Sequence, residues 1–506
     1  MRRGKKRLAA VLLVLGVAGV AAVAAYAAAE QGPSSSHSPY VLPASSDVST
    51  VSILTVGDNV PGTDGDGPGY QMVGIPDGLA AYRSGRDRFT VLTNHELRAD
   101  NGIPRAHGAT GAFVSKWTVD EDTLEVLQGE DLIQRVVLAP GGVYGAPQSG
   151  VVLGRLCSGD LAARSAFYNE DSGKGYRGRL FLSGEEVGQE GRAFAHDVTT
   201  GTSWELPFLG KVNWENAVAY PDTGDKTVVM VLDDQNPLGQ VYIYIGDKRE
   251  SGTPVERAGL VGGKLYGIAV EGFGSEPAAG IPSGTPFRLI QIANQATKTG
   301  TQIDAESVAG PITEFRRPED GSWNPDDDER DFYWVTTDRP QASGGTSRLW
   351  RLNFRKFKRF ADGELGGTID MLLDGTEGQE MLDNMTVDEH GRVLLNEDPG
   401  NNPIASRIWS YGIESDSLTL VATQKQTHGP QANPAYTGYT TNDEEVSGII
   451  PADHVLGEGW YLFDSQIHDS TFTSPASAQK LVEKGQLSAL YYPVDEEEDD
   501  EDDDDD

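Results

Sequence analysis

The sequence contains a single cysteine, Cys157, so no intrachain disulfide can form and stability must come from the core and from metals. Histidine is also scarce, and no histidine pair has the spacing of a zinc site. No Gly-x-Ser-x-Gly turn is present to supply a serine nucleophile. Long amphipathic helical patterns are rare, and no Pro- or Ser-rich linker divides the body of the chain. These absences exclude a disulfide-stapled domain and a serine hydrolase of the elbow type.

Positive charge is in short supply. The chain has 41 Lys and Arg against 77 Asp and Glu, a net charge of −36, which argues against nucleic acid as a partner. Such an excess fits an exported protein loaded with calcium, while general solubility and a salty habitat are the alternatives. The acidic run at residues 495–506 is expected to be a disordered, solvated tail.

The N-terminus predicts export. Basic residues precede an apolar stretch that begins at Leu8 and ends in small residues suited to cleavage, so residues 1–29 are interpreted as a signal peptide. The protein is therefore expected to be secreted or extracytoplasmic, with the cell surface as another location. An uncleaved anchor is the alternative, and only then would a membrane be a partner. Residues 30–46 are expected to form a disordered spacer, and residues 47–494 a single domain that is monomeric.

Six short runs of strand-forming residues end in acidic residues. They cover residues 89–96, 179–186, 227–234, 331–338, 392–398 and 459–464. With 61 glycines and 27 prolines spread among short strands, this pattern is typical of an all-β radial array. If each unit points one strand end at a common axis, carboxylates gather in one channel, where cations must offset their repulsion. The sequence therefore predicts a six-bladed β-propeller with a metal cluster in its axial channel.

Polar residues also begin apolar segments upstream of several of these runs, at residues 74–78, 214–218, 317–321 and 383–387. Turn chemistry explains such residues equally well at 76–78, but not at Glu215, which apolar residues flank. We expect side chains of both kinds to enter the same channel. The secondary candidates for metal binding are Asp77, Glu96, Asp338, Asp383, Asn384 and Asp464.

The order of these motifs resembles that of the PhoX-type alkaline phosphatases. The resemblance covers roughly residues 74–398 and rests on Cys157, the pair Glu185-Glu186, Glu215 in Trp-Glu-Asn-Ala-Val, Arg317-Pro-Glu-Asp-Gly, Asp383-Asn384 and Asn396-Glu397-Asp398. From the residues alone Cys157 is expected to be buried as a small apolar side chain. The resemblance implies instead that it is a thiolate ligand of iron.

The resemblance further implies an iron and calcium cluster that hydrolyses a small-molecule phosphate ester. Arg317 would bind and stabilise the phosphate, and Lys174 is a second candidate for substrate binding. The implied metal ligands are Cys157, Glu185, Glu186, Glu215, Asp233, Asp234, Glu319, Glu397 and Asp398. Hard cations would neutralise phosphoryl oxygens and activate a nucleophile, which is the chemistry that this hydrolysis requires.

The chain departs from the family pattern at Val187, where the family has an asparagine that contacts phosphate. Loss of a polar contact in a dry site can remove orders of magnitude from a rate. A non-catalytic, calcium-stabilised propeller that binds a partner is therefore an alternative, as is another propeller hydrolase, such as a phytase or lactonase. His95 and His468 are expected to be buried, hydrogen-bonded residues rather than ligands.

Overall fold

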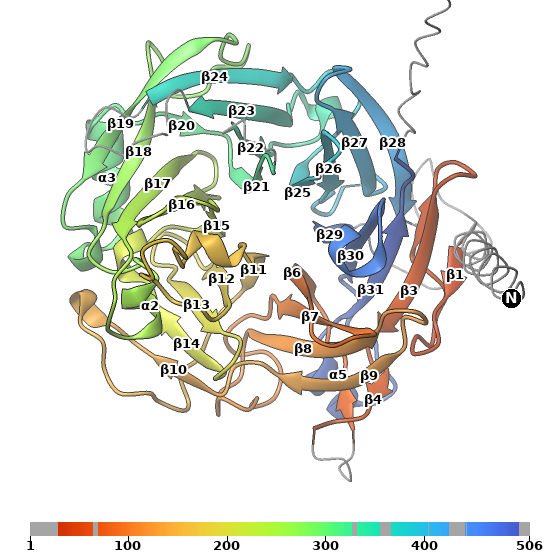
Figure 1. Cartoon of the computed structure of the whole chain (residues 1–506). Helices are drawn as coiled ribbons and strands as arrows, with labels where there is room; N and C mark the ends of the chain where they lie inside the picture. The colour runs from red at the N-terminus through yellow and green to blue at the C-terminus, as the bar shows by residue number, and fades with distance from the viewer. Residues whose placement is uncertain are drawn as a thin grey trace, which may run out of the picture.

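Strands are the main regular element of the fold. The computed structural model describes residues 29–63, 69–325, 331–354, 366–402, 404–424, 441 and 443–494. Within these residues the sheets stand side by side around a common centre, as Figure 1 shows. The predicted signal peptide, apart from Ala29, and the acidic tail lie outside the described residues.

The first two sheets after the N-terminal strands are antiparallel in their inner parts. One has the order β6 (Pro76–Arg83), β7 (Arg88–His95), β8 (Phe113–Asp120) and β9 (Val126–Asp131). The next has β11 (Leu156–Asp160) innermost, then β12 (Leu180–Glu185), β13 (Ala193–Asp197), β14 (Thr202–Glu205) and β10 (Arg135–Val137). β10 comes before the rest in sequence and adds to the outer edge in parallel with β14. Apart from β10, the strands of each sheet therefore follow one another from the centre outward.

Two such groups join at their outer edges into one large sheet. Its first group is β15 (Trp214–Ala219), β16 (Lys226–Asp233), β17 (Gly239–Asp247), β18 (Lys264–Val270) and β19 (Thr285–Ile292). The second is β21 (Pro318–Trp323), β22 (Asp331–Thr336), β23 (Arg348–Phe354) and β24 (Gly366–Leu373). β19 pairs with β24, and the short β20 (Glu314–Phe315) pairs with β17. The next sheet is β25 (Leu382–Val387), β26 (Arg392–Glu397), β27 (Arg407–Gly412), β28 (Ser417–Gln424) and β2 (Val41–Pro43).

The last sheet joins the two ends of the chain. β29 (Glu444–Pro451), β30 (Trp460–Ile467) and β31 (Lys484–Tyr491) come from its C-terminal part, and β3 (Ser49–Thr55) and β1 (Ala29–Gln31) from its N-terminal part. β3 pairs with β31 with Ser49 opposite Tyr491. This pairing closes the ring of sheets (Figure 1). Residues 30–46, expected to be a spacer, instead contain the end of β1 and all of β2, because both find strand partners.

The remaining elements are short. β4 (Asn59–Val60) and β5 (Tyr70–Gln71) form a small hairpin, and the helices are α2 (Pro254–Arg257), α3 (Gly300–Ala309), α4 (Asp453–Leu456) and α5 (Pro475–Leu481). Single 3-10 turns occur at Pro140–Gly142, Arg164–Ala166, Pro207–Leu209, Gln295–Thr297 and Gln341–Ser343. In the part of the chain that the structure describes, none of the helices has the length and apolarity needed to cross a membrane.

Large apolar side chains pack between neighbouring sheets. Trp117, Trp214, Trp334 and Trp350 are fully buried, and one cluster joins residues from β12 through β18. Towards the centre the strands approach closely and side chains become small or polar. A Cβ atom on Gly78 would lie 2.4 Å from the backbone nitrogen of Gly159, so glycine is required where β6 meets β11.

The inner strand pairs share one irregularity. In each, the ladder shifts register directly after a particular pair of residues; these pairs are Pro76–His95, Leu156–Glu185, Trp214–Asp233, Pro318–Thr336, Leu382–Glu397 and Val446–Ser465. A β-bulge redirects the side chains that follow it, and bulges are common beside active sites. The predicted all-β class is confirmed. The number of blades remains a prediction, which these repeated strand pairs support.

Candidate metal centre

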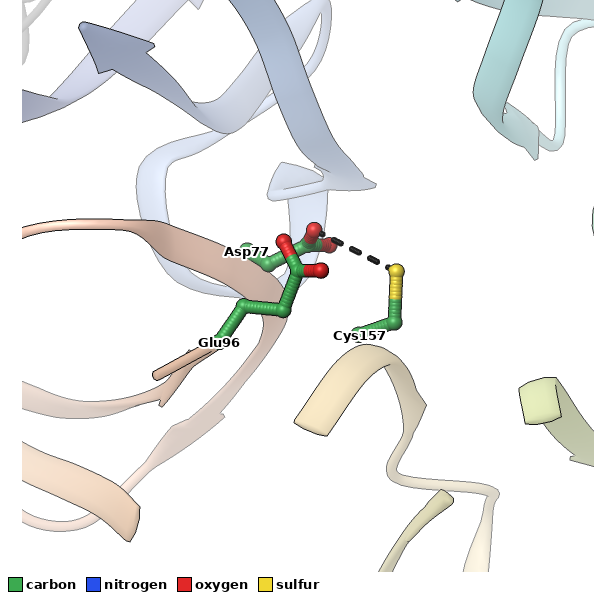
Figure 2. A group of neighbouring side chains, drawn as sticks. All are labelled: Asp77, Glu96 and Cys157. Atoms are coloured by element: carbon green, nitrogen blue, oxygen red, sulfur yellow. Dashed lines mark hydrogen bonds between the residues drawn. The ribbon is translucent and has the colours of Figure 1, made fainter. Parts of the chain in front are cut away.

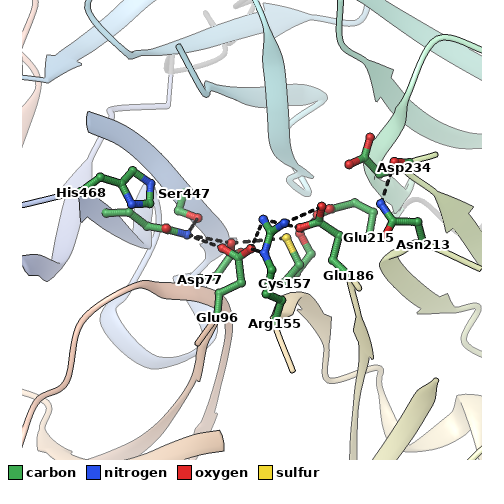
Figure 3. A network of polar contacts seen from close by, with 12 residues as sticks. Asp77, Glu96, Arg155, Cys157, Glu186, Asn213, Glu215, Asp234, Ser447 and His468 are labelled. Carbon is green, nitrogen blue, oxygen red and sulfur yellow. Dashed lines mark hydrogen bonds and ion pairs between the residues drawn. The ribbon is translucent and has the colours of Figure 1, made fainter. Parts of the chain in front are cut away.

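The shared bulge fixes which residues face the centre. The residue that follows the shifted pair on each innermost strand belongs to a set that we call the strand-start ring: Asp77, Cys157, Glu215, Glu319, Asp383 and Ser447. The residue that follows on each second strand belongs to the strand-end ring: Glu96, Glu186, Asp234, Thr337, Asp398 and Gln466. Five innermost strands thus carry an acid or Cys157 as their second residue. Figure 3 shows members of both rings lying together at the centre.

Carboxylates of the two rings come close enough to share cations. Ligand atoms of Asp77, Glu96 and Cys157 lie within 4.8 Å of one another, and Figure 2 shows the three side chains converging. The same limit holds for Glu215, Glu319 and Asp383 and for Asp383, Asp398 and Glu445. Asp383 belongs to two groups, so these groups adjoin.

Arginines neutralise part of this charge. Arg155 Nε donates to Glu96 Oε1 at 2.6 Å, and its Nη1 donates to Glu186 Oε1 at 3.0 Å. Arg317 donates to both oxygens of Asp234, at 2.6 and 3.0 Å, and lies 3.0 Å from Glu319. Each arginine directly precedes the first residue of a shifted pair and reaches the strand-end carboxylate of the preceding sheet unit.

The equivalent position in β29 holds an acid. Glu445 precedes Val446 as Arg155 precedes Leu156, and it lies beside Asp398, the strand-end carboxylate of the preceding unit. Where two other units have a guanidinium, this one therefore adds a negative charge. Asp383, Asp398 and Glu445 call for a cation from outside the chain.

Polar side chains orient the carboxylates. Gln466 Nε2 donates to Asp77 Oδ2 at 3.1 Å and to Glu96 Oε2 at 3.0 Å. Asn384 Nδ2 donates to Ser158 Oγ at 2.8 Å, and that hydroxyl donates to Glu215. A carboxylate held in this way needs little rearrangement to bind a metal ion.

Burial shifts the pKa of most of these groups upward. For Glu215, burial comes first and the charges of Asp383 and Asp77 add to it, so its pKa is raised well above the ordinary range. Burial likewise dominates for Asp383, followed by Asp398 and Asp77. At Glu96 burial opposes ionisation, but Arg155 and the hydrogen bond from Gln466 outweigh it and lower the pKa. Without cations, burial and like charge thus favour the protonated forms of Glu215 and Asp383.

Cys157 is 5% exposed, and its Sγ donates to Asp77 Oδ2 over 3.5 Å. Burial raises the pKa of its thiol well above the usual value, and the charges of Asp77 and Glu215 raise it further. A metal ion would reverse this balance, since coordination deprotonates a thiol. Both expectations for Cys157, burial and a place among metal ligands, are compatible with its position.

The residues present fit a mixed metal cluster. Calcium prefers several oxygen ligands, which the carboxylates supply, whereas a thiolate selects a transition metal such as iron. The residues that could hold such ions are the acids of the two rings together with Cys157 and Glu445.

Several predicted ligands face away from the centre. Glu185 accepts hydrogen bonds from Arg192 Nε at 2.6 Å and Gly154 N at 3.0 Å. Glu397 pairs with Arg407 and Trp409, and Asp233 accepts from the backbone of Asn213. Successive side chains of a strand alternate between its faces, so only the second acid of each adjacent pair enters a ring.

Three further candidates do not join the rings. Asp338 forms an ion pair with Arg316 at 2.8 Å. Thr337, and not Asp338, occupies the strand-end ring in this sheet unit. Asp464 is buried next to the rings but lies two residues before Gln466, the ring member of its strand. Lys174 pairs with Asp225 at 2.7 Å, and Asp225 directly precedes β16, at the opposite end from Asp233. The structure thus leaves Lys174 without a role at this site.

The sequence reasoning missed Arg155, Glu445, Gln466, Ser158 and Ser447. Glu445 lies in β29, one position before the shifted pair of that strand. Arg155 and Glu445 each directly precede the first residue of a shifted pair, and the position of that shift cannot be read from the sequence.

The histidines have defined partners. His95 is fully buried, with hydrogen bonds to Gly74 O and Ser115 Oγ, as expected. His468 is partly buried and lies 2.6 Å from Glu483 Oε2. Burial disfavours its charged form, but the hydrogen bond and charge of Glu483 outweigh this effect and raise the pKa of His468 to about 9.

Comparison with solved structures supports the fold. No family model and no curated protein matches the chain. Among solved structures, PhoX of Pseudomonas fluorescens in complex with vanadate, a transition-state analogue, has a TM-score of 0.61 at 14% identity, over 88% of this chain and 95% of that one. This chain has a β-propeller fold. The likeness to TolB of Acinetobacter baumannii, with a TM-score of 0.29 and 11% identity over 81% and 65% of the two chains, carries no argument.

Proposed function

We propose that this propeller is an exported, metal-dependent phosphatase that hydrolyses small-molecule phosphomonoesters with iron and calcium. The observation that carries the proposal is the pair of rings, in which buried carboxylates and one thiol gather beside the guanidinium of Arg317. The similarity of fold to PhoX supports the same class of chemistry. The protein is proposed to act as a monomer, and we propose no role for nucleic acid.

When bound, the metal ions would neutralise phosphoryl oxygens and lower the pKa of a bound water. Asp77, Glu96 and Cys157 would hold an ion at the thiol, and Glu215 and Glu319 an ion beside Asp383. Asp383, Asp398 and Glu445 would surround a harder cation. Arg317 would present a planar fork of donors to the phosphate. Gln466 and Asn384 would keep the carboxylates oriented.

Elemental analysis together with a phosphatase assay tests this function. Protein purified from its native export route is expected to contain iron and calcium and to hydrolyse phosphomonoesters. Folded protein that contains calcium but no iron, with a reduced Cys157, would exclude the proposed mechanism.

A second function is favoured by Val187. Its side chain is 49% exposed directly after Glu186, at the position where PhoX-type phosphatases have a polar contact to phosphate. A calcium-stabilised propeller that binds a partner without catalysis would tolerate valine there. Fully metal-loaded protein that hydrolyses no ester in a broad panel would favour this second function.

A further inference from the structure

Arg155 and Arg317 occupy the same place in two different sheet units. Each directly precedes a shifted pair, and each has a left-handed backbone, with φ of 29° and 40°. The carbonyl of Arg155 accepts from Glu186 N, and that of Arg317 accepts from Thr337 N, the strand-end residues of their own units. A left-handed conformation is costly for a side chain of this size, so the fold holds both arginines in an unfavourable backbone state.

The two guanidiniums are the accessible part of a buried network. The side chains of Arg155 and Arg317 are 38% and 28% exposed, whereas their carboxylate partners range from 2% for Glu319 to 11% for Glu186. The two guanidiniums are therefore more accessible to solvent than the carboxylates that they bind. Figure 3 shows Arg155 together with Glu186 and Glu215, and Asp234 to one side of them with its partner Asn213.

The sheet unit that begins with β15 lies between the units of the two arginines and has Asn213 in place of an arginine. Asn213 occupies the equivalent position there, but its side chain is already engaged: Nδ2 donates to Asp234 O at 2.8 Å, and Oδ1 accepts from Gly188 N. This contact also fixes the turn that carries the exposed Val187. The side chain of Asn213 therefore has no role in the anion site that we infer for Arg155 and Arg317.

We infer that Arg155 and Arg317 form a two-arginine clamp for the phosphate group of the substrate, with Arg155 as an additional phosphate-binding residue. Metal ions bound to Glu186, Glu96 and Asp234 would compete with the arginines for the same oxygens and leave N–H groups free to bind an anion. This inference rests on the proposed function for the identity of the substrate. The equivalent positions of the two arginines support a shared role in anion binding whether or not the protein catalyses a reaction.

The clamp favours phosphomonoesters over diesters. A guanidinium binds two oxygens of one phosphate through parallel hydrogen bonds, and two such forks require a group with several unesterified oxygens. A monoester offers three and a diester only two. The clamp would thus select for the degree of esterification, while the rest of the substrate would lie towards solvent near Val187.

Binding of inorganic phosphate to metal-loaded protein tests the clamp without relying on hydrolysis. R155A is expected to weaken phosphate binding by roughly 10- to 100-fold with metal content unchanged, as for the loss of a charge-assisted pair. R155K should restore part of the affinity, because it keeps the charge without the planar fork. In assays of phosphomonoester hydrolysis, R155A should raise KM and lower kcat.

R351A provides the matched control. Arg351 has the same 28% exposure as Arg317 and also contacts two carboxylates, those of Asp331 and Asp370, away from the rings. Its replacement should leave phosphate affinity unchanged. The clamp is excluded if R155A and R155K, with full metal content, bind phosphate like the wild type, or if R155K loses its metals. Wild-type protein that binds phosphate through Arg155 but hydrolyses no ester would exclude the proposed function and keep the clamp.

Discussion

Arg317 is the residue at which the proposed metal assembly and the proposed catalysis can be tested separately. Its guanidinium holds Asp234 and Glu319, yet it offers no ligand atom to a metal ion. Burial disfavours its charge, but Glu319 and Asp234 more than compensate and raise its pKa further above the ordinary value. Arg317 therefore stays charged at every pH at which the protein is folded.

Replacement of Arg317 by alanine should lower phosphomonoester hydrolysis by roughly 10²-fold, as for other preorganised donors, and leave the metal content intact. R317K should recover only part of the rate, since a point charge does not reproduce the fork. Steady-state kinetics on protein with measured iron and calcium checks both. Loss of metal in R317A would instead make Arg317 a residue that assembles the centre.

Cys157 allows a complementary test. C157S should lose or weaken iron while calcium remains, because a hydroxyl is a much poorer ligand than a thiolate at neutral pH. Elemental analysis of the two proteins prepared in parallel gives the answer. Unchanged iron in C157S would show that Cys157 is only a buried side chain.

At the scale of single residues, the sequence predicted where acids gather but not which acid of a pair faces the axis. Glu186 and Asp398 enter the strand-end ring, while Glu185 and Glu397 bind arginines on the other face. A period of two leaves both choices open until the position of the bulge is known. The same ambiguity affects Asp338, which was predicted as a metal-ligand candidate, because the ring position is occupied by Thr337.

At the scale of elements, the β3–β31 pair decides whether the ring of sheets closes. Ile53 in β3 is fully buried, at 0% exposure, in an apolar cluster that includes Val51 and Leu487. The acid-ended runs revealed six of the inner strands, but β1 and β2 escaped detection. Both are only three residues long, and β2 pairs with β28, far away in sequence. Long-range pairing of this kind leaves little local signal.

I53A should therefore destabilise the fold by about 2–5 kcal/mol, the usual range for removing a large aliphatic side chain from a core. Chemical denaturation of metal-loaded protein measures this change, with V143A as a control, since Val143 is 72% exposed. A change in I53A no larger than that in V143A would mean that β3 adds little to closure.

At the scale of the whole molecule, the stability of the metal-free protein should depend on pH in an unusual direction. Burial raises the pKa of Asp160 to about 7 and that of Asp320 to about 6. Folded-state pKa values above the unfolded ones contribute stability below about pH 4, and this contribution is lost as the pH rises through 6 and 7. Chelated protein should thus melt at a higher temperature at pH 5 than at pH 8.

Metal-loaded protein should behave differently, because ions that bind only the folded state stabilise it by mass action and replace the protons. Its melting temperature should fall sharply on chelation at pH 8 and less at pH 5. Differential scanning calorimetry at both pH values distinguishes the cases. A chelated protein, shown by analysis to be free of metal, that melts at the same temperature as the loaded one would refute the idea of a carboxylate ring held together by cations.

The closure of the ring by β3 and β31 also sets an order of events during synthesis. β3 is made early, but its partner spans residues 484–491, so its edge remains unpaired until nearly all of the described chain exists. Members of the two rings come from positions as far apart as Asp77 and Gln466. The proposed metal centre would therefore form late in synthesis: a nascent chain would lack some of its ligands, and a chain truncated before Gln466 would not assemble the complete site.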